Sequence, residues 1–175
     1  GLRQEWVGRV FMNPPFSKGQ DFRHVCHALR FLKPGGRFVT VTATNWSEAQ
    51  NAELSALAEA LLFIGGRVQL VDERIAPTLR RGQTVVCDRF HDSTLAYQGF
   101  GGGLDARWLD RVGRRAIGGR MPNLTVLLDV PVARGFTRLR RPHDRMERKT
   151  RAFHERVRAG YLKLAKREPR RFVVI

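Results

Sequence analysis

The stretch "VVCDRFHDSTLAYQGFGGGLD", residues 85–105, carries an apolar run straight into Asp88 and Arg89, then into a polar turn and glycines. A short apolar run bounded in this way predicts a buried strand at residues 84–87. Ligands of parallel α/β sheets bind beyond the carboxyl ends of the strands. Because an Arg side chain stays charged and offers a planar fork of donors, Arg89 suits a phosphate at that edge. An Arg that caps the strand or pairs with Asp88 is the alternative.

Strand and helix patterns alternate along the rest of the chain. The other apolar runs that predict strands are residues 9–12, 37–43, 124–130 and 171–175. Helical patterns are expected at 19–36, from Glu53 to Gly82 with a weak point at Gly65 and Gly66, after Asp105, after Pro131, and at 151–168. This alternation predicts an α/β fold in which helices cover both faces of a parallel sheet.

The composition fits a globular, strongly basic chain. Its 175 residues, 42% of them hydrophobic, are enough for one domain with a real core. Thirty-two Lys and Arg against sixteen Asp and Glu give a formal net charge of +16. This charge suggests an anionic partner such as nucleotide, phosphate or nucleic acid. Because the cations are spread along the chain, a compositional bias without a polyanion surface is an equal alternative.

Cellular location and chain ends follow from a few residues. Cys26 and Cys87 have no metal-ligand spacing, so no metal site is expected, and reduced thiols are typical of a cytoplasmic protein. No apolar run approaches the roughly 20 residues of a membrane-spanning helix, so no membrane partner is expected. The chain begins with Gly1 rather than Met and stops within the apolar run at 171–175, so both ends are expected to be truncated.

An aromatic and a basic residue stand four apart in the long helical pattern. At that spacing Phe63 and Arg67 share one face of the helix, one turn from each other. A nucleobase requires such a pair, because the aromatic ring stacks on the base and the Arg recognises its edge. A core Phe beside a surface Arg is the alternative.

From about residue 53 to 175 the chain resembles thymidylate kinase. The segments that carry the resemblance are "SALAEALLF" with "RVQLV", "CDRFHDSTLAYQGFG", "PNLTVLLDVPV", "DRMERKTRAFHERVRAGYL" and "EPRRFVVI", in the order and spacing of that family. The resemblance implies a P-loop-kinase-like fold, phosphoryl transfer from ATP with Mg²⁺ to dTMP giving dTDP, and a homodimer.

The resemblance also implies a role for each residue of a dTMP pocket. Phe63 would stack on thymine, and Arg67 would form a hydrogen bond to its O4 edge. Arg89 would hold the phosphate, and Asp88 would stand at the phosphoryl-transfer centre. Ser93 and Thr94 would touch the base, Tyr97 would pack on the deoxyribose and disfavour a 2′-hydroxyl, and Gln98 would lie beside them. Residues 138–148 correspond to the lid, where Arg140, Arg141 or Arg145 would neutralise charge on the transferring phosphates. A solvated surface charge is the alternative for each of these three.

The phosphate-donor motif of that family is missing. Phosphoryl transfer there requires a G-x-x-x-x-G-K-[ST] loop, and neither "FSKGQ" nor "KPGGRF" has its spacing or its ending. The acceptor residues are present without a recognisable donor loop. The chain is therefore expected to bind dTMP and to be inactive as a kinase.

A different family is matched near the N-terminus. Residues 9–46 resemble the catalytic segment of adenine-type DNA methyltransferases, with Asn13, Pro14, Pro15 and Phe16 as its N-P-P-F motif. In that family the Asn side chain and a Pro carbonyl accept hydrogen bonds from the target amine, and the aromatic residue packs on a flipped base. The glycine-rich motif that binds S-adenosylmethionine is absent, and a Pro-rich turn between strand and helix is the alternative.

Two architectures combine these pieces. In one, residues 9–43 form an atypical N-terminal β-α-β unit within a single P-loop-kinase-like sheet. In the other, which the sequence favours, a methyltransferase-like fragment at 1–48 was joined to a thymidylate-kinase-like domain at 49–175. The kinase function is favoured because its resemblance covers more of the chain. A fragment of a DNA methyltransferase and a non-catalytic basic module that binds nucleotide or nucleic acid are the alternatives.

Overall fold

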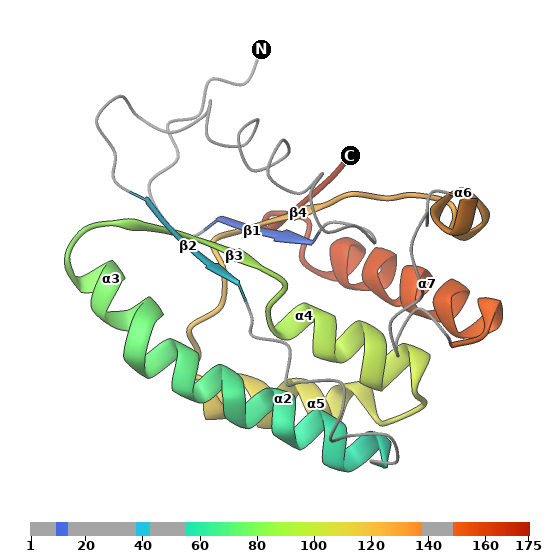
Figure 1. Cartoon of the computed structure of the whole chain (residues 1–175), viewed down its shortest axis with the longest axis horizontal. Helices are drawn as coiled ribbons and strands as arrows, with labels where there is room; N and C mark the ends of the chain where they lie inside the picture. The colour runs from blue at the N-terminus through green and yellow to red at the C-terminus, as the bar shows by residue number, and fades with distance from the viewer. Residues whose placement is uncertain (1–9, 14–37, 43–54, 138–148) are drawn as a thin grey trace.

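A computed structural model of the chain describes residues 10–13, 38–42, 55–137 and 149–175. Within these residues five strands form one sheet in the order β2-β3-β1-β4-β5, and every neighbouring pair is parallel (Figure 1). The strands are β1 (Val10–Asn13), β2 (Phe38–Thr42), β3 (Thr84–Asp88), β4 (Leu124–Leu127) and β5 (Phe172–Val174). The predicted α/β class with a parallel sheet is confirmed.

Strand β1 occupies the centre of the sheet. Its Phe11 is in register with Cys87 of β3 on one side and with Thr125 of β4 on the other. Strand β2 lies on the far side of β3, with Val41 opposite Cys87. The two N-terminal strands thus extend the same sheet as the three later ones, the arrangement of the single-sheet alternative. The joining of two fragments and the boundary at 48/49 stay predictions.

A continuous helical stretch runs from residue 56 to residue 80. It comprises α2 (Ala56–Leu70), the π-helical turn η2 (Val71–Ile75) and α3 (Ala76–Arg80). The Ser55 side chain caps its start by accepting a hydrogen bond from the backbone N–H of Ala58 at 3.2 Å. Helix α2 passes through Gly65 and Gly66 without a break, and the low helix propensity of these two residues stays a predicted weak point.

The irregular turn lies further along, just before Pro77. Proline has no N–H for the carbonyl four residues earlier, and its ring crowds that carbonyl. In this helix the carbonyl belongs to Glu73, within the π-helical residues 71–75. A widened turn at this place accommodates the proline without ending the helix. Buried Ala60 and Ile64 anchor α2 on the core side, which offsets the low helix propensity of its two glycines.

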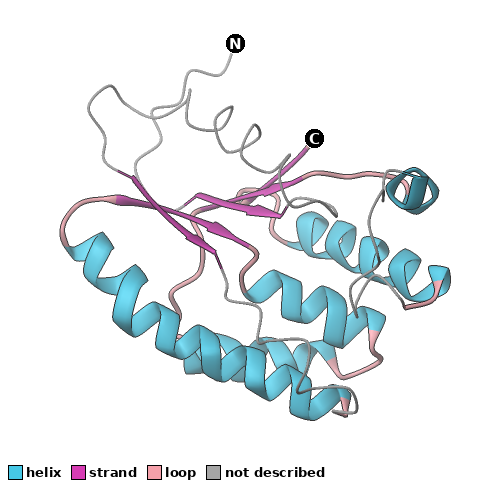
Figure 2. Cartoon of the chain, in the orientation of Figure 1, coloured by secondary structure: helices cyan, strands magenta, loops and turns pink. Residues whose placement is uncertain are grey.

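The remaining helices surround the residues that follow β3. They are α4 (His91–Thr94), the π-helical η3 (Leu95–Gly101), α5 (Ala106–Ala116), α6 (Val132–Thr137) and α7 (Arg151–Arg167). Asp105 caps α5 and Thr150 caps α7 through their side-chain oxygens. Helices α2 to α5 lie on one side of the strands (Figures 1 and 2). The helix predicted at 19–36 lies outside the described residues.

Two buried clusters fix β3 and the helices after it. One joins η2 to β3 through Val71, Ile75, Val85 and Cys87. The other packs α7 against η3 and α5, with side chains such as Leu95, Leu109, Val157 and Tyr161 at its centre. Burying a large apolar side chain stabilises the fold by about 1.5–3 kcal/mol. The segment between Asp88 and Gly101 is therefore held from both sides.

A glycine-to-alanine pair tests this packing. A methyl group at Gly113 would lie 2.5 Å from Nδ1 of His91 and closer still to Cε1, while one at Gly65 would meet nothing within 4 Å. His91 is fully buried and cannot swing away. We expect Gly113→Ala to lower the free energy of unfolding by about 1–3 kcal/mol, and Gly65→Ala to raise it by about 0.5–1 kcal/mol. Urea unfolding followed by circular dichroism measures both, and equal effects would contradict the packing described.

Candidate functional site

The ends of four strands meet at one edge of the sheet. Met12 of β1 is in register with Asp88, the last residue of β3, and Asn13 is in register with Leu127, the last residue of β4. Thr42, which ends β2, is opposite Asp88 on the other side. This is the carboxyl edge at which parallel sheets bind ligands. Asp88 and Arg89 lie there as predicted from the sequence.

The chain turns sharply at Arg89. Its φ of 61° is in the left-handed region, and among the described non-glycine residues it alone has a positive φ. Such a conformation strains a residue with a Cβ and is often found at binding sites. The Arg89 guanidinium carbon lies 5.1 Å from the centroid of the Tyr97 ring, within the range of a cation–π contact. Two residues assigned to the phosphate and the deoxyribose are thus neighbours.

Arg67 points from α2 into this turn. Its Nη2 donates hydrogen bonds to the carbonyl oxygen of Phe90 at 3.1 Å and to Oγ1 of Thr94 at 3.0 Å. Burial lowers the pKa of Arg67 to about 10, so the guanidinium remains charged at neutral pH. The other terminal nitrogen, Nη1, is buried and has no hydrogen-bond partner among the described residues. A buried donor without a partner is costly, and a ligand that accepts from it would remove that cost.

Phe63 lies one turn before Arg67 on α2. Its side chain is 38% exposed, whereas the guanidinium of Arg67 is buried against the turn. The alternative of a core Phe beside a surface Arg is therefore the reverse of what the structure shows. That Phe63 stacks on thymine and that Arg67 bonds its O4 edge stay predictions.

Ser93, Tyr97 and Gln98 line the same region but are tied to the protein. The hydroxyl of Tyr161 on α7 donates to Oγ of Ser93 at 2.8 Å. Burial raises the pKa of Tyr161 above its usual range, so this hydroxyl remains a neutral donor. The Tyr97 ring packs edge-on to Tyr161 with centroids 6.3 Å apart. The Gln98 amide donates to Oε1 of Glu59 on α2 at 2.6 Å, which links η3 to the helix that carries Arg67.

Several predicted site residues lie outside the described part of the chain. They are Arg140, Arg141 and Arg145 of the lid, and Pro14, Pro15 and Phe16 of the methyltransferase-like motif. Asn13 of that motif is the last residue of β1. Their roles stay predictions.

The sequence reasoning overlooked the buried charges beside the turn. Asp92 and Arg171 are 4% and 9% exposed and form a two-pronged ion pair, with Nη1–Oδ2 at 2.7 Å and Nη2–Oδ1 at 2.8 Å. Nothing in the local sequence distinguishes these two from surface charges, because they are 79 residues apart. The one available signal was position, since Asp92 is the single Asp, Glu, Lys or Arg in residues 90–104, which follow Arg89.

The described residues contain no group of three or more His, Cys, Asp or Glu side chains placed to hold a metal ion. Within the same residues no helix is both long enough and apolar enough to cross a bilayer.

Sheet order and edge geometry place this chain in the class of P-loop-type kinases, and comparison with known proteins agrees. The thymidylate kinase family model matches residues 26–175, beginning upstream of residue 53, where the resemblance was noted. The thymidylate kinase of Thermomicrobium roseum is 47% identical over 146 residues, covering 82% of this chain and 69% of that protein. That of Citrifermentans bemidjiense is 46% identical over 136 residues, 73% of this chain and 60% of that protein.

A solved structure shows the same likeness. The crystal structure of thymidylate kinase from Ehrlichia chaffeensis superimposes with a TM-score of 0.73 at 25% identity, over 97% of this chain and 88% of that one. The chain therefore belongs to the thymidylate kinase family. The matched part spans between 60% and 69% of the length of the two curated relatives.

The buried thiol below the site provides a test of its geometry. Burial raises the pKa of Cys87 to about 12, and its Sγ donates to the carbonyl oxygen of Arg89 at 3.3 Å. Since the thiolate is the reactive form, we expect Cys87 to react with iodoacetamide at pH 8 roughly a hundredfold or more slowly in the folded protein than in urea. Mass spectrometry of a Cys26→Ser variant isolates this residue. Comparable rates in the two states would show that Cys87 is accessible and that the turn is placed differently.

Proposed function

We propose that this chain binds dTMP as the phosphoryl acceptor of a thymidylate kinase, which transfers phosphate from ATP and forms dTDP. The observation that carries the proposal is the hydrogen bonding of Arg67. Its Nη2 donates to Phe90 and Thr94, whereas its buried Nη1 has no partner among the described residues and could donate to an acceptor atom of a ligand. In this proposal that acceptor is O4 of thymine, and the exposed ring of Phe63 stacks on the base. The names of the relatives support the same substrate.

The remaining pocket residues extend the proposal toward the phosphate. Arg89 would hold the dTMP phosphate beyond the end of β3, and Asp88 would stand at the transfer centre. Tyr97, under the Arg89 guanidinium, would pack against the deoxyribose and leave no room for a 2′-hydroxyl. Ser93 and Thr94 would touch the base, with Gln98 beside them.

Membership of the thymidylate kinase family implies the use of ATP and Mg²⁺. Magnesium is usually held by one or two carboxylates together with the phosphates of the nucleotide, not by a cage of protein ligands. Asp88 fits that requirement by its position at the carboxyl edge, and the described residues offer no dedicated metal cluster. Bound magnesium would neutralise phosphate charge, and the lid residues Arg140, Arg141 and Arg145 would add to it. A homodimer and a cytoplasmic location are further proposals from the family.

The expected kinase activity depends on the loop that would bind the phosphates of ATP. In this fold the phosphate-binding loop follows a strand, and central β1 runs into "NPPFSKGQ" in place of G-x-x-x-x-G-K-[ST]. We therefore propose that the chain as it stands binds dTMP without efficient turnover. The family match over residues 26–175 favours a thymidylate kinase over a methyltransferase fragment or a basic nucleic-acid module.

Substitution of Arg89 tests the acceptor site. A charge-assisted contact to phosphate is worth about 1.5–3 kcal/mol, so Arg89→Ala is expected to weaken dTMP binding about tenfold to a hundredfold while thymidine binding changes little. Isothermal titration calorimetry measures both affinities. Arg115→Ala, which removes an exposed cation on α5, is the matched control. Equal losses for dTMP and thymidine would place Arg89 away from the phosphate.

A turnover assay tests the donor side separately. With ATP, Mg²⁺ and dTMP, formation of dTDP is expected to stay at background, since no loop of the required spacing is present to cradle the donor phosphates. Chromatographic separation of dTMP from dTDP gives the readout, with a relative that carries the complete loop as the positive control. Magnesium-dependent dTDP formation would contradict the expected inactivity and at the same time establish the kinase activity.

A further inference from the structure

The strained turn at Arg89 needs outside support. A left-handed non-glycine residue persists where its surroundings determine it, and Arg89 is followed after one residue by the short helix α4, His91–Thr94. Arg67 supports the turn from α2 by binding the Phe90 carbonyl. This contact fixes one side of the turn and leaves α4 itself to be held by something else.

Asp92 of α4 supplies that second attachment. Its two carboxylate oxygens accept from the two terminal nitrogens of Arg171, which directly precedes β5, at 2.7 Å and 2.8 Å. Parallel bonds of this kind fix direction as well as distance. Arg171 Nη1 also donates to Oγ1 of Thr125 on β4 at 2.8 Å. The carboxylate of α4 is thus linked to β4 and to the residue that precedes β5.

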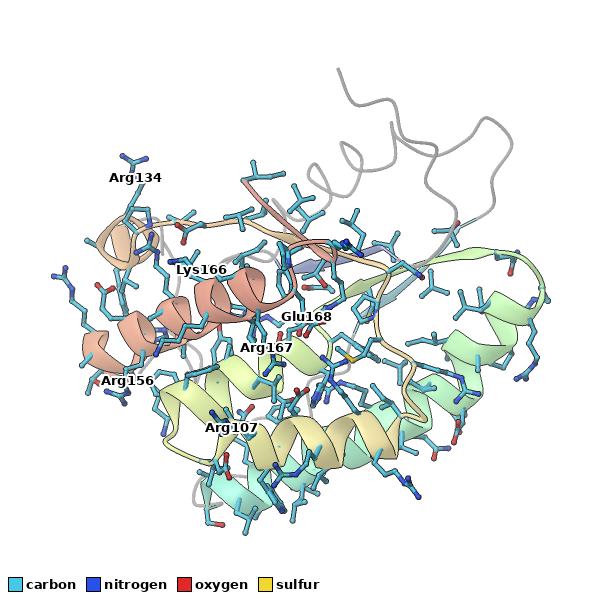
Figure 3. The ribbon with its side chains drawn as sticks, turned by 180° about the vertical axis from the view of Figure 1, so that it is seen from behind. Arg107, Arg134, Arg156, Lys166, Arg167 and Glu168 are labelled. Atoms are coloured by element: carbon cyan, nitrogen blue, oxygen red, sulfur yellow. The ribbon has the colours of Figure 1, made fainter. Side chains whose placement is uncertain are left out.

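The third arm of Arg171 reaches α7. Its Nε donates to Oε2 of Glu168 at 2.7 Å, and Arg114 of α5 donates to the other oxygen of that carboxylate at 2.7 Å. Figure 3 shows Arg167 and Glu168 at the end of α7 that faces α5. Although burial alone would lower it, the hydrogen bonds that Arg171 donates to Asp92 and Glu168 raise its pKa. Arg171 is therefore charged, and each of its three guanidinium nitrogens is bound within the protein.

We propose that the Asp92–Arg171 ion pair is a positioning pair for Arg89, through which the segment preceding the last strand sets the direction of the phosphate-binding side chain. The proposal rests on the assignment of dTMP as the ligand. Asp92 is three residues from Arg89, in the helix that the turn leads into, and the pair is buried where water cannot substitute for a lost partner. Removing one partner leaves an unpaired buried charge that must move toward solvent, and α4 must move with it.

Binding measurements with dTMP and thymidine test the pair. Arg171→Gln is expected to weaken dTMP binding about tenfold and thymidine binding less than about twofold. The reason is that displacement of Arg89 would weaken its contact with the phosphate, which thymidine lacks. Arg171→Lys, which keeps the charge but loses the fork, is expected to recover part of the loss. Arg114→Gln is the control, since it releases the same Glu168 carboxylate without touching Asp92. Equal losses for both ligands, or a dTMP-selective loss in the control, would overturn the proposal.

A double variant separates positioning from general destabilisation. If Arg171 acts through Arg89, then Arg171→Gln in the Arg89→Ala background should weaken dTMP binding by less than about twofold more, whereas independent contributions would multiply. A multiplied loss would overturn the proposal. If Arg171→Gln does not fold, Thr125→Val removes one hydroxyl contact to each member of the pair and keeps the ion pair. A dTMP-selective loss of about two- to threefold is then expected, and no selective loss would overturn it.

Hydrogen exchange tests the positioning role of the Asp92–Arg171 pair without any ligand, so its outcome does not depend on whether the protein binds dTMP. Without any nucleotide, amides of residues 89–94 should exchange faster in Arg171→Gln or Thr125→Val than in the unmodified chain and in Arg114→Gln. Unchanged exchange in this segment would overturn the positioning role whatever the protein binds. If these amides exchange faster in the variants but the chain does not bind dTMP, the positioning role of the Asp92–Arg171 pair would stand and the assignment of dTMP as the ligand would be wrong.

Discussion

Strand β3 ends at the carboxyl edge of the sheet, and the backbone leaves that edge toward α4 through a left-handed residue. Because the residue is Arg89 and not glycine, the turn costs about 1 kcal/mol or more, which the surrounding contacts must offset. Most of the site geometry follows from this requirement. Phe90 is bound by Arg67, the thiol of Cys87 binds the Arg89 carbonyl, and the Arg89 side chain is carried over the Tyr97 ring.

The supports of the turn differ in their energetics. Arg67 has one buried guanidinium nitrogen without a hydrogen-bond partner among the described residues, so the cost of its burial is only partly offset. Arg171 is buried with every nitrogen bonded and contributes mainly a fixed geometry, since the desolvation of both charges offsets much of their attraction. Loss of either partner from such a pair costs about 3–5 kcal/mol, far more than the pair contributes when intact. In the proposed function, Arg67 therefore has a donor left for a ligand, whereas Arg171 holds α4 in position.

The sequence predicted the features that depend on local pattern. Apolar runs located all five strands, and the rule that ligands bind beyond strand ends placed Asp88 and Arg89 at the edge. Helical spacing put Phe63 and Arg67 on one face, but it could not say which of them is buried, because that depends on α4 packing against α2. Gly65 and Gly66 do not interrupt α2, because Ala60 and Ile64 pack on its core side, while the irregular turn follows from Pro77. The Asp92–Arg171 pair joins positions 79 residues apart, which no local pattern connects.

The fit of the His91 ring against Gly113 has a consequence for sequence variation among relatives. His91 is completely buried on α4, and its ring takes up the volume that a side chain at position 113 would need. The two positions therefore share one fixed space between α4 and α5. A relative that carries alanine or a larger residue at 113 must have a smaller side chain at 91, and histidine at 91 requires glycine at 113. Substitutions at these two sites should thus be inherited together, although 22 positions separate them in the sequence.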